Sequence, residues 1–309
     1  MKLIIQIPCL NEAETLPITL TDLPTAVAGF DTVEWLIVDD GSTDDTAAVA
    51  RAHGVHHVVR HTRNQGLAKA FMNGLRAATD LGADVIVNTD ADNQYCADDI
   101  PKLVAPILAG HADIVVGARP IATIEHFSPA KKFLQKLGSW VVRVVSRTDI
   151  PDAPSGFRAM SREAAKRLMV FNDYTYTLET IIQAGQRNMA IVSVPIRVNG
   201  DLRPSRLVKS IPGYIRRSIG TMIRIFVIYR PFRFFGTIGL TLLALGTLIG
   251  LRFVFLWLQG EGAGHVQSLI LAAILLGAGF NTILIAFIAD LLAANRKLLE
   301  DIRMLATDK

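Results

Sequence analysis

The residues best suited to chemistry form an acidic turn, Asp90-Ala91-Asp92-Asn93-Gln94, directly after the apolar run Val85-Ile86-Val87. Hard divalent cations such as Mg²⁺ prefer oxygen ligands and commonly take one or two carboxylates together with substrate phosphates. Two carboxylates at positions i and i+2 of a turn can divide this work, one facing a metal and a diphosphate, the other a nucleotide. Acidic pairs in loops are usually just solvated, so the interpretation needs support from other segments.

Four further polar segments lie where strands are expected to end or helices to begin. The carboxylates of Val38-Asp39-Asp40-Gly41-Ser42-Thr43-Asp44 can accept hydrogen bonds from a ribose or a base edge, whereas Ser42 or Thr43 also suits a helix N-cap. An arginine at a strand end, as in Val116-Gly117-Ala118-Arg119, is suited to a diphosphate or a lipid phosphate. The other two segments are Ile7-Pro8-Cys9-Leu10-Asn11-Glu12 and Arg63-Asn64-Gln65-Gly66-Leu67.

The elements around these segments alternate between strand-like and helix-like patterns. Strands are predicted at residues 3–8, 34–39, 56–59, 84–89 and 113–117, with helices between them, for example at 68–81 and 98–109. This alternation predicts an α/β fold, a mostly parallel sheet with helices on both faces. In such sheets ligands bind beyond the carboxyl ends of the strands, where the polar segments fall.

The last third of the 309-residue chain is much more apolar than the rest. Residues 234–251, extended past Arg252 to residue 258, and residues 266–289 are each near the roughly 20 residues that a membrane-spanning helix needs. The alternative is a buried helical hairpin in a soluble core, but such helices usually carry a polar stripe. The sequence therefore predicts two transmembrane helices, and the membrane as a partner.

The distribution of charge predicts the orientation of these spans. Residues 1–196 contain 18 Lys and Arg against 22 Asp and Glu, whereas residues 197–233 contain nine Lys and Arg against Asp201 alone. A basic block before a span, with no Lys or Arg in the connector 259–267, predicts that both termini and the N-terminal domain are cytoplasmic. Nucleic-acid binding is the rival interpretation, but no nucleic-acid motif accompanies the block.

Residues 205–229 mix arginines with apolar residues, which predicts amphipathic helices in the membrane interface, broken near Pro212-Gly213 and Gly220. A solvated helix packed on the soluble domain is the alternative. We expect no secretory signal, because the first apolar stretch ends at Ile7. Cys9 and Cys96 have no metal-ligand or redox spacing and are expected to be free thiols.

In combination the motifs resemble family 2 glycosyltransferases of the GT-A fold, specifically the polyprenyl-phosphate glycosyltransferases similar to dolichol-phosphate mannose synthase. The resemblance covers about residues 3–232 and is carried by the ordered set as a whole. Besides the five segments above, that set includes Ser155-Gly156-Phe157-Arg158 and Arg203-Pro204-Ser205-Arg206-Leu207.

The resemblance implies a role for each matching residue. For the nucleotide pocket it implies Pro8, Leu10, Glu12, Val38 and Asp40, and for donor contact Asp90 and Ala91. For Mg²⁺ or Mn²⁺ it implies Asp92 and Gln94, and for donor or acceptor phosphate Arg119, Arg158, Arg203 and Arg206. Lys209, in the basic segment beside the membrane, is expected to help Arg203 and Arg206 hold the lipid phosphate. Extra residues between Arg197 and Ser205 leave open which arginine meets which phosphate, and a structural ion pair is the alternative for Arg158. Glu179 contacts the sugar or orients an arginine. Asp92, Arg119 and Glu179 are the expected catalytic set.

The predicted activity is an inverting transfer of a sugar from a UDP- or GDP-linked donor to undecaprenyl or dolichyl phosphate at the inner membrane of a cell. The predicted organisation is a GT-A domain at 1–200, juxtamembrane helices at 201–232, two spans at 233–293 and a cytoplasmic tail at 294–309. Two spans in each subunit could associate, so this organisation is compatible with a homo-oligomer. The alternatives are a processive polysaccharide synthase, disfavoured because no Gln-x-x-Arg-Trp motif is present, and a non-catalytic, membrane-tethered nucleotide-binding regulator. Two spans with few polar groups make a poor transport pathway.

Overall fold

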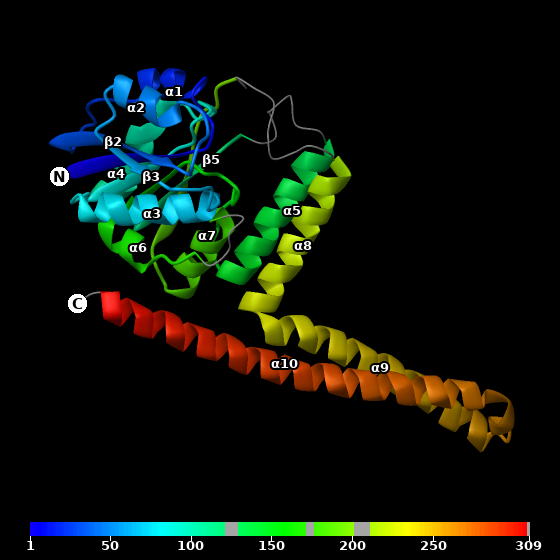
Figure 1. Cartoon of the computed structure of the whole chain (residues 1–309). Coiled ribbons are helices and arrows are strands. Elements are labelled where there is room, and N and C mark those ends of the chain that lie inside the picture. Colours follow the sequence, from blue (N-terminus) through cyan, green and yellow to red (C-terminus); the bar gives the residue numbers. More distant parts are fainter. Residues whose placement is uncertain (121–128, 171–175, 201–210, 308–309) are drawn as a thin grey trace. The chain divides into compact units, whose positions relative to one another are not determined.

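The computed structural model describes residues 1–120, 129–170, 176–200 and 211–307. Within them, seven strands form one sheet in the order β3-β2-β1-β4-β6-β5-β7 (Figure 1). Only β6 runs antiparallel to its neighbours, β4 and β5. The strands are β1 (Lys2–Cys9), β2 (Thr32–Asp39), β3 (His57–Arg60), β4 (Val85–Asn88), β5 (Ile114–Ala118), β6 (Arg158–Ser161) and β7 (Ile191–Pro195). The predicted mostly parallel α/β sheet is thereby confirmed.

Each of the five predicted strands is present within two residues of its expected bounds, whereas β6 and β7 were not predicted. The central strands are buried on both faces: β1 and β4 present almost no exposed side chain. Such strands form near-continuous apolar runs, which is why β1 and β4 are easy to recognise in sequence. β6 has four residues, begins at Arg158 and lacks that signal.

Helices cover both faces of the sheet. One face packs against α1 (Leu16–Asp22), α2 (Thr46–Ala52) and α4 (Ile100–Leu108), which share a core cluster with Leu3, Ile5 and Ile7 of β1. The opposite face carries α3 (Leu67–Asp80), whose Gly74 lies against Gln6 and Val38. The remaining helices of this part are α5 (Pro129–Ser146), α6 (Arg162–Arg167) and α7 (Thr177–Gln186), with a short 3₁₀ turn at Ala97–Asp99.

The chain divides into two compact units, Met1–Ser218 and Ile219–Lys309. The helix α8 (Ile211–Tyr229) is continuous through Gly220, so the break predicted there is wrong. A single glycine weakens a helix without ending it. The described part of α8 begins at Ile211, so the break near Pro212-Gly213 stays a prediction. Residues 201–210, the first part of the predicted interfacial region, lie outside the described residues.

The second unit contains α9 (Pro231–Leu258) and α10 (Val266–Thr307), joined through a short 3₁₀ turn at Gly262–His265. Both helices are long and apolar enough to cross a membrane. Their contact is built on small residues: a Cβ atom added to Gly239 would lie 2.7 Å from Ile283 and 3.0 Å from the carbonyl oxygen of Gly279. Small residues let two helix backbones approach closely, a common form of packing between spans.

Candidate active site

The acidic turn after β4 is anchored by Asn88, the last residue of that strand. Asn88 accepts a hydrogen bond from the side-chain amide of Gln6 (2.9 Å) and donates to the carbonyl oxygen of Gly156 and the hydroxyl of Tyr176 (2.9 Å each). All four groups are buried, where each unmade hydrogen bond would cost about 1–3 kcal/mol. The end of β4 is therefore fixed to β1, to the start of β6 and to the segment before α7.

The turn itself is held from both flanks. The hydroxyl of Thr19 in α1 donates to the carbonyl oxygen of Ala91 (2.9 Å), and Asn93, at a φ of 55°, donates through its side chain to Asp22 (2.7 Å). The side-chain amide of Asn199 donates to the carbonyl oxygen of Asn93 (3.0 Å). These contacts leave the carboxylates of Asp90 and Asp92 placed by a rigid backbone.

Burial, then the neighbouring charge of Asp92, raises the pKa of Asp90 from 3.8 to about 7. Glu12 adds to this rise, while Arg119 and Arg158 oppose it. The carboxylates of three predicted site residues, after β1 and β4, therefore lie within electrostatic range of each other and of Arg119. A divalent cation bound here would reduce the repulsion between these carboxylates.

The predicted metal ligands fit such a cation in chemistry. Asp92 and Gln94 are adjacent and half-buried, and Oδ1 of Asp92 accepts the backbone N–H of Gln94 (3.2 Å). Both side chains carry the oxygen atoms that Mg²⁺ and Mn²⁺ prefer. Among the described residues, no group of three or more His, Cys, Asp or Glu side chains is arranged to hold a metal ion. A cation here would therefore depend on further oxygens, such as those of a diphosphate, and its binding stays a prediction.

Arg119, at the end of β5, forms a bidentate ion pair with Asp152. Its Nε and one terminal nitrogen donate to the two oxygens of Asp152 (2.7 and 3.0 Å), and its backbone N–H adds a third bond (3.2 Å). Burial alone would lower the pKa of Arg119, but Tyr95 and Asp152 outweigh it and raise the pKa above its usual value. Asp152 was not predicted. Its position three residues before the Ser155-Gly156-Phe157-Arg158 motif is a signal that could have identified it.

Arg158 is fully buried, and its guanidinium donates to the carbonyl oxygens of Ala153 and Ser155 (2.8 Å each) and to the hydroxyl of Thr180. Burial lowers its pKa to about 10. These partners belong to the protein and fix the orientation of the guanidinium. They are two carbonyl oxygens and a hydroxyl, and they use three of its five N–H donors. The contact of Arg158 with a phosphate stays a prediction.

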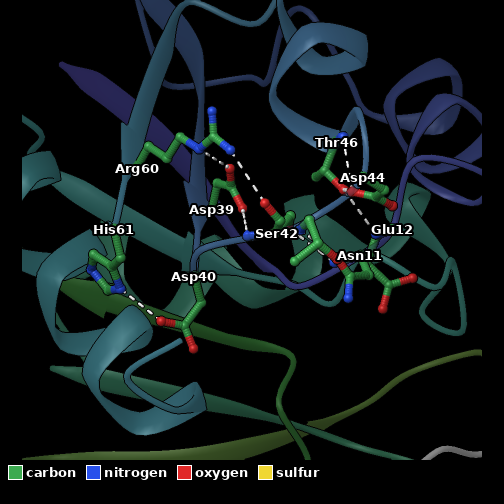
Figure 2. A network of polar contacts seen from close by, with 10 residues as sticks. Asn11, Glu12, Asp39, Asp40, Ser42, Asp44, Thr46, Arg60 and His61 are labelled. Carbon is green, nitrogen blue, oxygen red and sulfur yellow. Dashed lines mark hydrogen bonds and ion pairs between the residues drawn. The ribbon is translucent and has the colours of Figure 1, made fainter. Parts of the chain in front are cut away.

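The two adjacent carboxylates at the end of β2 have different surroundings (Figure 2). Asp39 accepts the backbone N–H of Ser42 (2.8 Å) and lies 3.1 Å from Nε of Arg60, so it closes the turn. Asp40 accepts the backbone N–H groups of Gln65 and Gly66 (2.8 Å each) and contacts Nδ1 of His61 (2.7 Å). It thereby links the ends of β2 and β3.

The segment after β1 is fastened to the same turn (Figure 2). Asn11, at a φ of 55°, accepts the backbone N–H of Thr43 (2.8 Å), and the backbone N–H of Glu12 donates to the hydroxyl of Thr46 (2.9 Å). Leu10 and Glu12 are half-buried at the sheet edge, whereas the side chains of Pro8 and Val38 are buried within their strands. The predicted roles of Pro8 and Val38 in a nucleotide pocket stay predictions.

Three groups of predicted residues differ in how far the structure describes them. Asp90, Ala91, Asp92, Gln94 and Arg119 come together at the carboxyl edge of the sheet. Glu179 lies in the first turn of α7 and is buried, 8% exposed, so its predicted contact with the sugar stays a prediction. The predicted acceptor ligands Arg203, Arg206 and Lys209 lie outside the described residues.

Two tyrosines that sequence reasoning missed complete the wall. The hydroxyl of Tyr95 accepts the backbone N–H of Gly156 (2.9 Å), and burial raises the pKa of Tyr95 to about 12. Tyr176 stacks on Phe71 with ring centroids 3.8 Å apart. A Cβ atom at Gly156 would lie 2.9 Å from the hydroxyl of Tyr176 and 3.1 Å from the carboxylate oxygens of Asp90, so the site requires glycine there.

Curated relatives share most of the first unit. The chain is 29% identical over 224 residues to an undecaprenyl-phosphate mannosyltransferase of Micrococcus luteus, covering 69% of this chain and 90% of the relative. It is 30% identical over 213 residues to a UDP-N-acetylglucosamine–dolichyl-phosphate N-acetylglucosaminyltransferase of Methanococcus voltae, covering 62% and 83%. It is 28% identical over 206 residues to a polyprenol monophosphomannose synthase of Mycolicibacterium smegmatis, covering 63% and 76%.

Solved structures share the fold. A glucosyl-3-phosphoglycerate synthase of Mycobacterium tuberculosis, crystallised with Mn²⁺, UDP and glucosyl-3-phosphoglycerate, superposes with a TM-score of 0.58 at 23% identity, covering 72% of this chain and 79% of that one. The sequence model described as glycosyl transferase family 2 matches residues 4–169, more than half of the chain. With its GT-A-like sheet and the acidic turn at the carboxyl edge, the chain belongs to glycosyl transferase family 2 and is a glycosyltransferase.

Proposed function

We propose that this glycosyltransferase moves a sugar from a UDP- or GDP-linked donor to a polyprenyl phosphate at a membrane surface. The observation that carries the proposal is the meeting of Asp90, Asp92 and Arg119 at one sheet edge, in a chain that also has two helices apolar enough to span a membrane. Relatives named for undecaprenyl, polyprenol and dolichyl phosphates support the class of acceptor.

On the donor side, the residues of the acidic turn would meet the diphosphate. Asp92 and Gln94 would hold Mg²⁺ or Mn²⁺, which when bound supplies positive charge to the departing diphosphate. Arg119, oriented by Asp152, would add a guanidinium for the same oxygens. Asp40 would receive the base, and Leu10 and Glu12 would flank it.

On the acceptor side, the chemistry needs little from the protein. The second pKa of a phosphate monoester is about 6, so a polyprenyl phosphate is largely ionised near neutral pH and can attack without a general base. Attack opposite the leaving group would invert the anomeric carbon. Arg203, Arg206 and Lys209 remain the proposed ligands of the acceptor phosphate.

The helix α5, which sequence reasoning did not single out, supports contact with a lipid surface. Its exposed face carries Phe133 (64% exposed), Trp140 (51%) and Val144 (37%). The exposed Lys136 and the half-exposed Arg143 flank these apolar side chains. Aromatic residues beside basic ones on one helix face are typical of helices that lie in a membrane interface.

The proposed topology follows from the charges of the sequence. Both termini and the catalytic domain would be cytoplasmic, at the inner membrane of the cell, with residues 259–267 outside. The proposed organisation keeps the catalytic domain at 1–200, juxtamembrane helices at 201–232, the spans at 233–293 and a cytoplasmic tail at 294–309.

The test uses the full-length chain in detergent with undecaprenyl phosphate, Mn²⁺ or Mg²⁺ and a panel of UDP- and GDP-sugars, with products identified by mass spectrometry. We expect one sugar per lipid phosphate, lost on chelation and restored by the metal. Asp92→Asn should abolish transfer with an unchanged melting temperature. Asp80→Asn, which removes an exposed carboxylate from the last residue of α3, is the matched control and should be fully active.

Each alternative has its own outcome. Products with many sugars per acceptor would indicate a polysaccharide synthase. Nucleotide binding without transfer from any donor would indicate a regulator. Full activity of Asp92→Asn, with metal concentrations controlled, would remove the proposed role of the acidic turn.

A further inference from the structure

His61 connects two elements that meet at the carboxyl edge of the sheet. It follows β3 directly and is 7% exposed. Its Nδ1 lies 2.7 Å from Oδ1 of Asp40, a contact drawn as a dashed line in Figure 2. Its Nε2 lies 2.8 Å from the side-chain nitrogen of Asn73 in α3. The imidazole therefore bridges the carboxylate after β2 to a helix on one face of the sheet.

These contacts select one tautomer of the ring. The side-chain nitrogen of Asn73 can only donate, so Nε2 of His61 accepts and Nδ1 carries the hydrogen that Asp40 receives. With both ring nitrogens engaged, the imidazole is fixed in orientation. In this tautomer His61 donates the hydrogen bond to Asp40.

Among the described residues, three N–H groups donate to the carboxylate of Asp40, whose side chain is 5% exposed. Oδ1 accepts from His61 and from the backbone N–H of Gln65, and Oδ2 accepts from the backbone N–H of Gly66. A carboxylate offers about four acceptor positions, so the remaining one is on Oδ2. Gly66 supplies its N–H from a φ of 96°, a backbone conformation that side chains rarely adopt.

We propose that His61 is a positioning residue, which holds Asp40 and the Gln65–Gly66 turn so that the remaining acceptor of Asp40 meets an N–H group of the donor's base. This inference rests on the proposed function, because it requires a nucleotide donor at this edge. His61 would not touch the ligand; it would act through Asp40. Its loss should therefore weaken nucleotide binding and leave the chemical step unchanged.

The same strand provides a matched control. His57 is the first residue of β3, and its Nε2 lies 2.7 Å from Oε2 of Glu34. This pair has the same distance as the pair of His61 and Asp40, but its side chains are more exposed and it lies at the opposite end of the strand. His57→Leu therefore tests whether the loss of any histidine–carboxylate contact in β3 is enough to alter donor binding.

The experiment compares the full-length wild type in detergent with His61→Leu, His61→Asn and His57→Leu. Asparagine places an N–H donor near the position of Nδ1, so it should restore the bond to Asp40. The readouts are the affinities for UDP and for GDP by calorimetry, the donor KM, kcat and the melting temperature. The polyprenyl phosphate KM reports on the acceptor side.

We expect His61→Leu to weaken binding of the preferred nucleotide and to raise the donor KM by about tenfold to a hundredfold, the range for one hydrogen bond to a charged group. The kcat should stay within about twofold. His61→Asn should fall within about threefold of the wild type, and His57→Leu should leave the donor KM unchanged. If His61→Leu does not fold, Asn73→Ala, which frees the ring, should weaken nucleotide binding by at least about threefold.

Wild-type nucleotide affinity in His61→Leu or, failing its folding, in Asn73→Ala would overturn the inference while leaving the proposed function intact. So would an equal loss in His57→Leu, or a loss in His61→Asn as large as in His61→Leu. A wild-type chain that binds neither UDP nor GDP would overturn both the inference and the proposed function.

Discussion

The pair formed by Arg119 and Asp152 offers the strongest test of how the site is held together. The side chain of Asp152 is 1% exposed and that of Arg119 is 12% exposed, and three hydrogen bonds join the two residues. Asp152→Asn keeps the shape but removes the charge, leaving a nearly buried guanidinium without its counterion. Breaking a buried pair in this way costs about 3–5 kcal/mol. For a unit of this size each kcal/mol lowers the melting temperature by about 2–4 °C, so we expect a fall of about 6–20 °C.

The assay is a double-mutant cycle with Asp152→Asn, Arg119→Met and the combined variant, each as the full-length chain in detergent. Melting is followed by tryptophan fluorescence and transfer by product mass. Each single variant leaves a buried partner unpaired, so the combined variant should be more stable than the sum predicts, by about 1–3 kcal/mol. Activity should behave differently. Asp152→Asn should lose about a hundredfold through misorientation, and both variants without Arg119 should lose more.

Comparing stability with activity separates the role of Asp152 in stabilising Arg119 from the role of Arg119 in the reaction. Recovery of stability in the combined variant, without recovery of transfer, would show that Asp152 stabilises Arg119 and that the guanidinium serves the reaction. Additive melting shifts would refute the coupling read from the structure. Full transfer by Arg119→Met would refute the assignment of Arg119 to the reaction.

Three further predictions concern other parts of the chain. Burial would raise the pKa of Asp99, but hydrogen bonds from Arg197 and other neighbours lower this pKa from 3.8 to about 2. The ionised Asp99 should therefore stabilise the fold above pH 4, and this stabilisation should be lost as the pH falls toward 2. Asp99→Asn should flatten the profile of melting temperature against pH in this range. Trp140→Glu should raise the polyprenyl phosphate KM severalfold in proteoliposomes, whereas the same change at Ile18, an exposed residue of α1, should not. Gly239→Val should destabilise the hairpin of α9 and α10, measured as loss of monodisperse protein after extraction, whereas Gly277→Val, whose added Cβ meets nothing within 4 Å, should have little effect.

The fold could be predicted where a local pattern has a single physical meaning. Five strands and the helices between them were recognisable because buried parallel strands are short apolar runs and helices keep a period near 3.6 residues. The strand β6 failed that test: it has four residues, runs antiparallel and includes the buried arginine Arg158. Its place between β4 and β5 follows from contacts distant in sequence, which no window along the chain reveals.

The sequence predicts which residues of the candidate site lie at the ends of strands. Asp90, Asp92 and Arg119 could be grouped because the carboxyl ends of parallel strands share one edge. Their partners could not: Asp152 lies 33 positions from Arg119, and His61 lies 21 positions from Asp40. A supporting side chain contacts a functional one in space and carries no distinctive local pattern, so a lone acidic residue or a lone histidine resembles any other in the sequence.

Neighbouring acidic residues in this chain can differ in exposure and in hydrogen-bond partners. Asp99 is wholly buried against Arg197 and Lys102, whereas the side chain of Asp98 is 78% exposed. Asp39 and Asp40 divide more subtly, because Asp39 closes its own turn and Asp40 joins two strands while keeping one acceptor position. In a motif of two neighbouring carboxylates, one can therefore be engaged by its own turn while the other keeps an acceptor position for a ligand. Which one it is depends on the hydrogen-bond donors that the fold brings to each, and these donors come from other strands and helices.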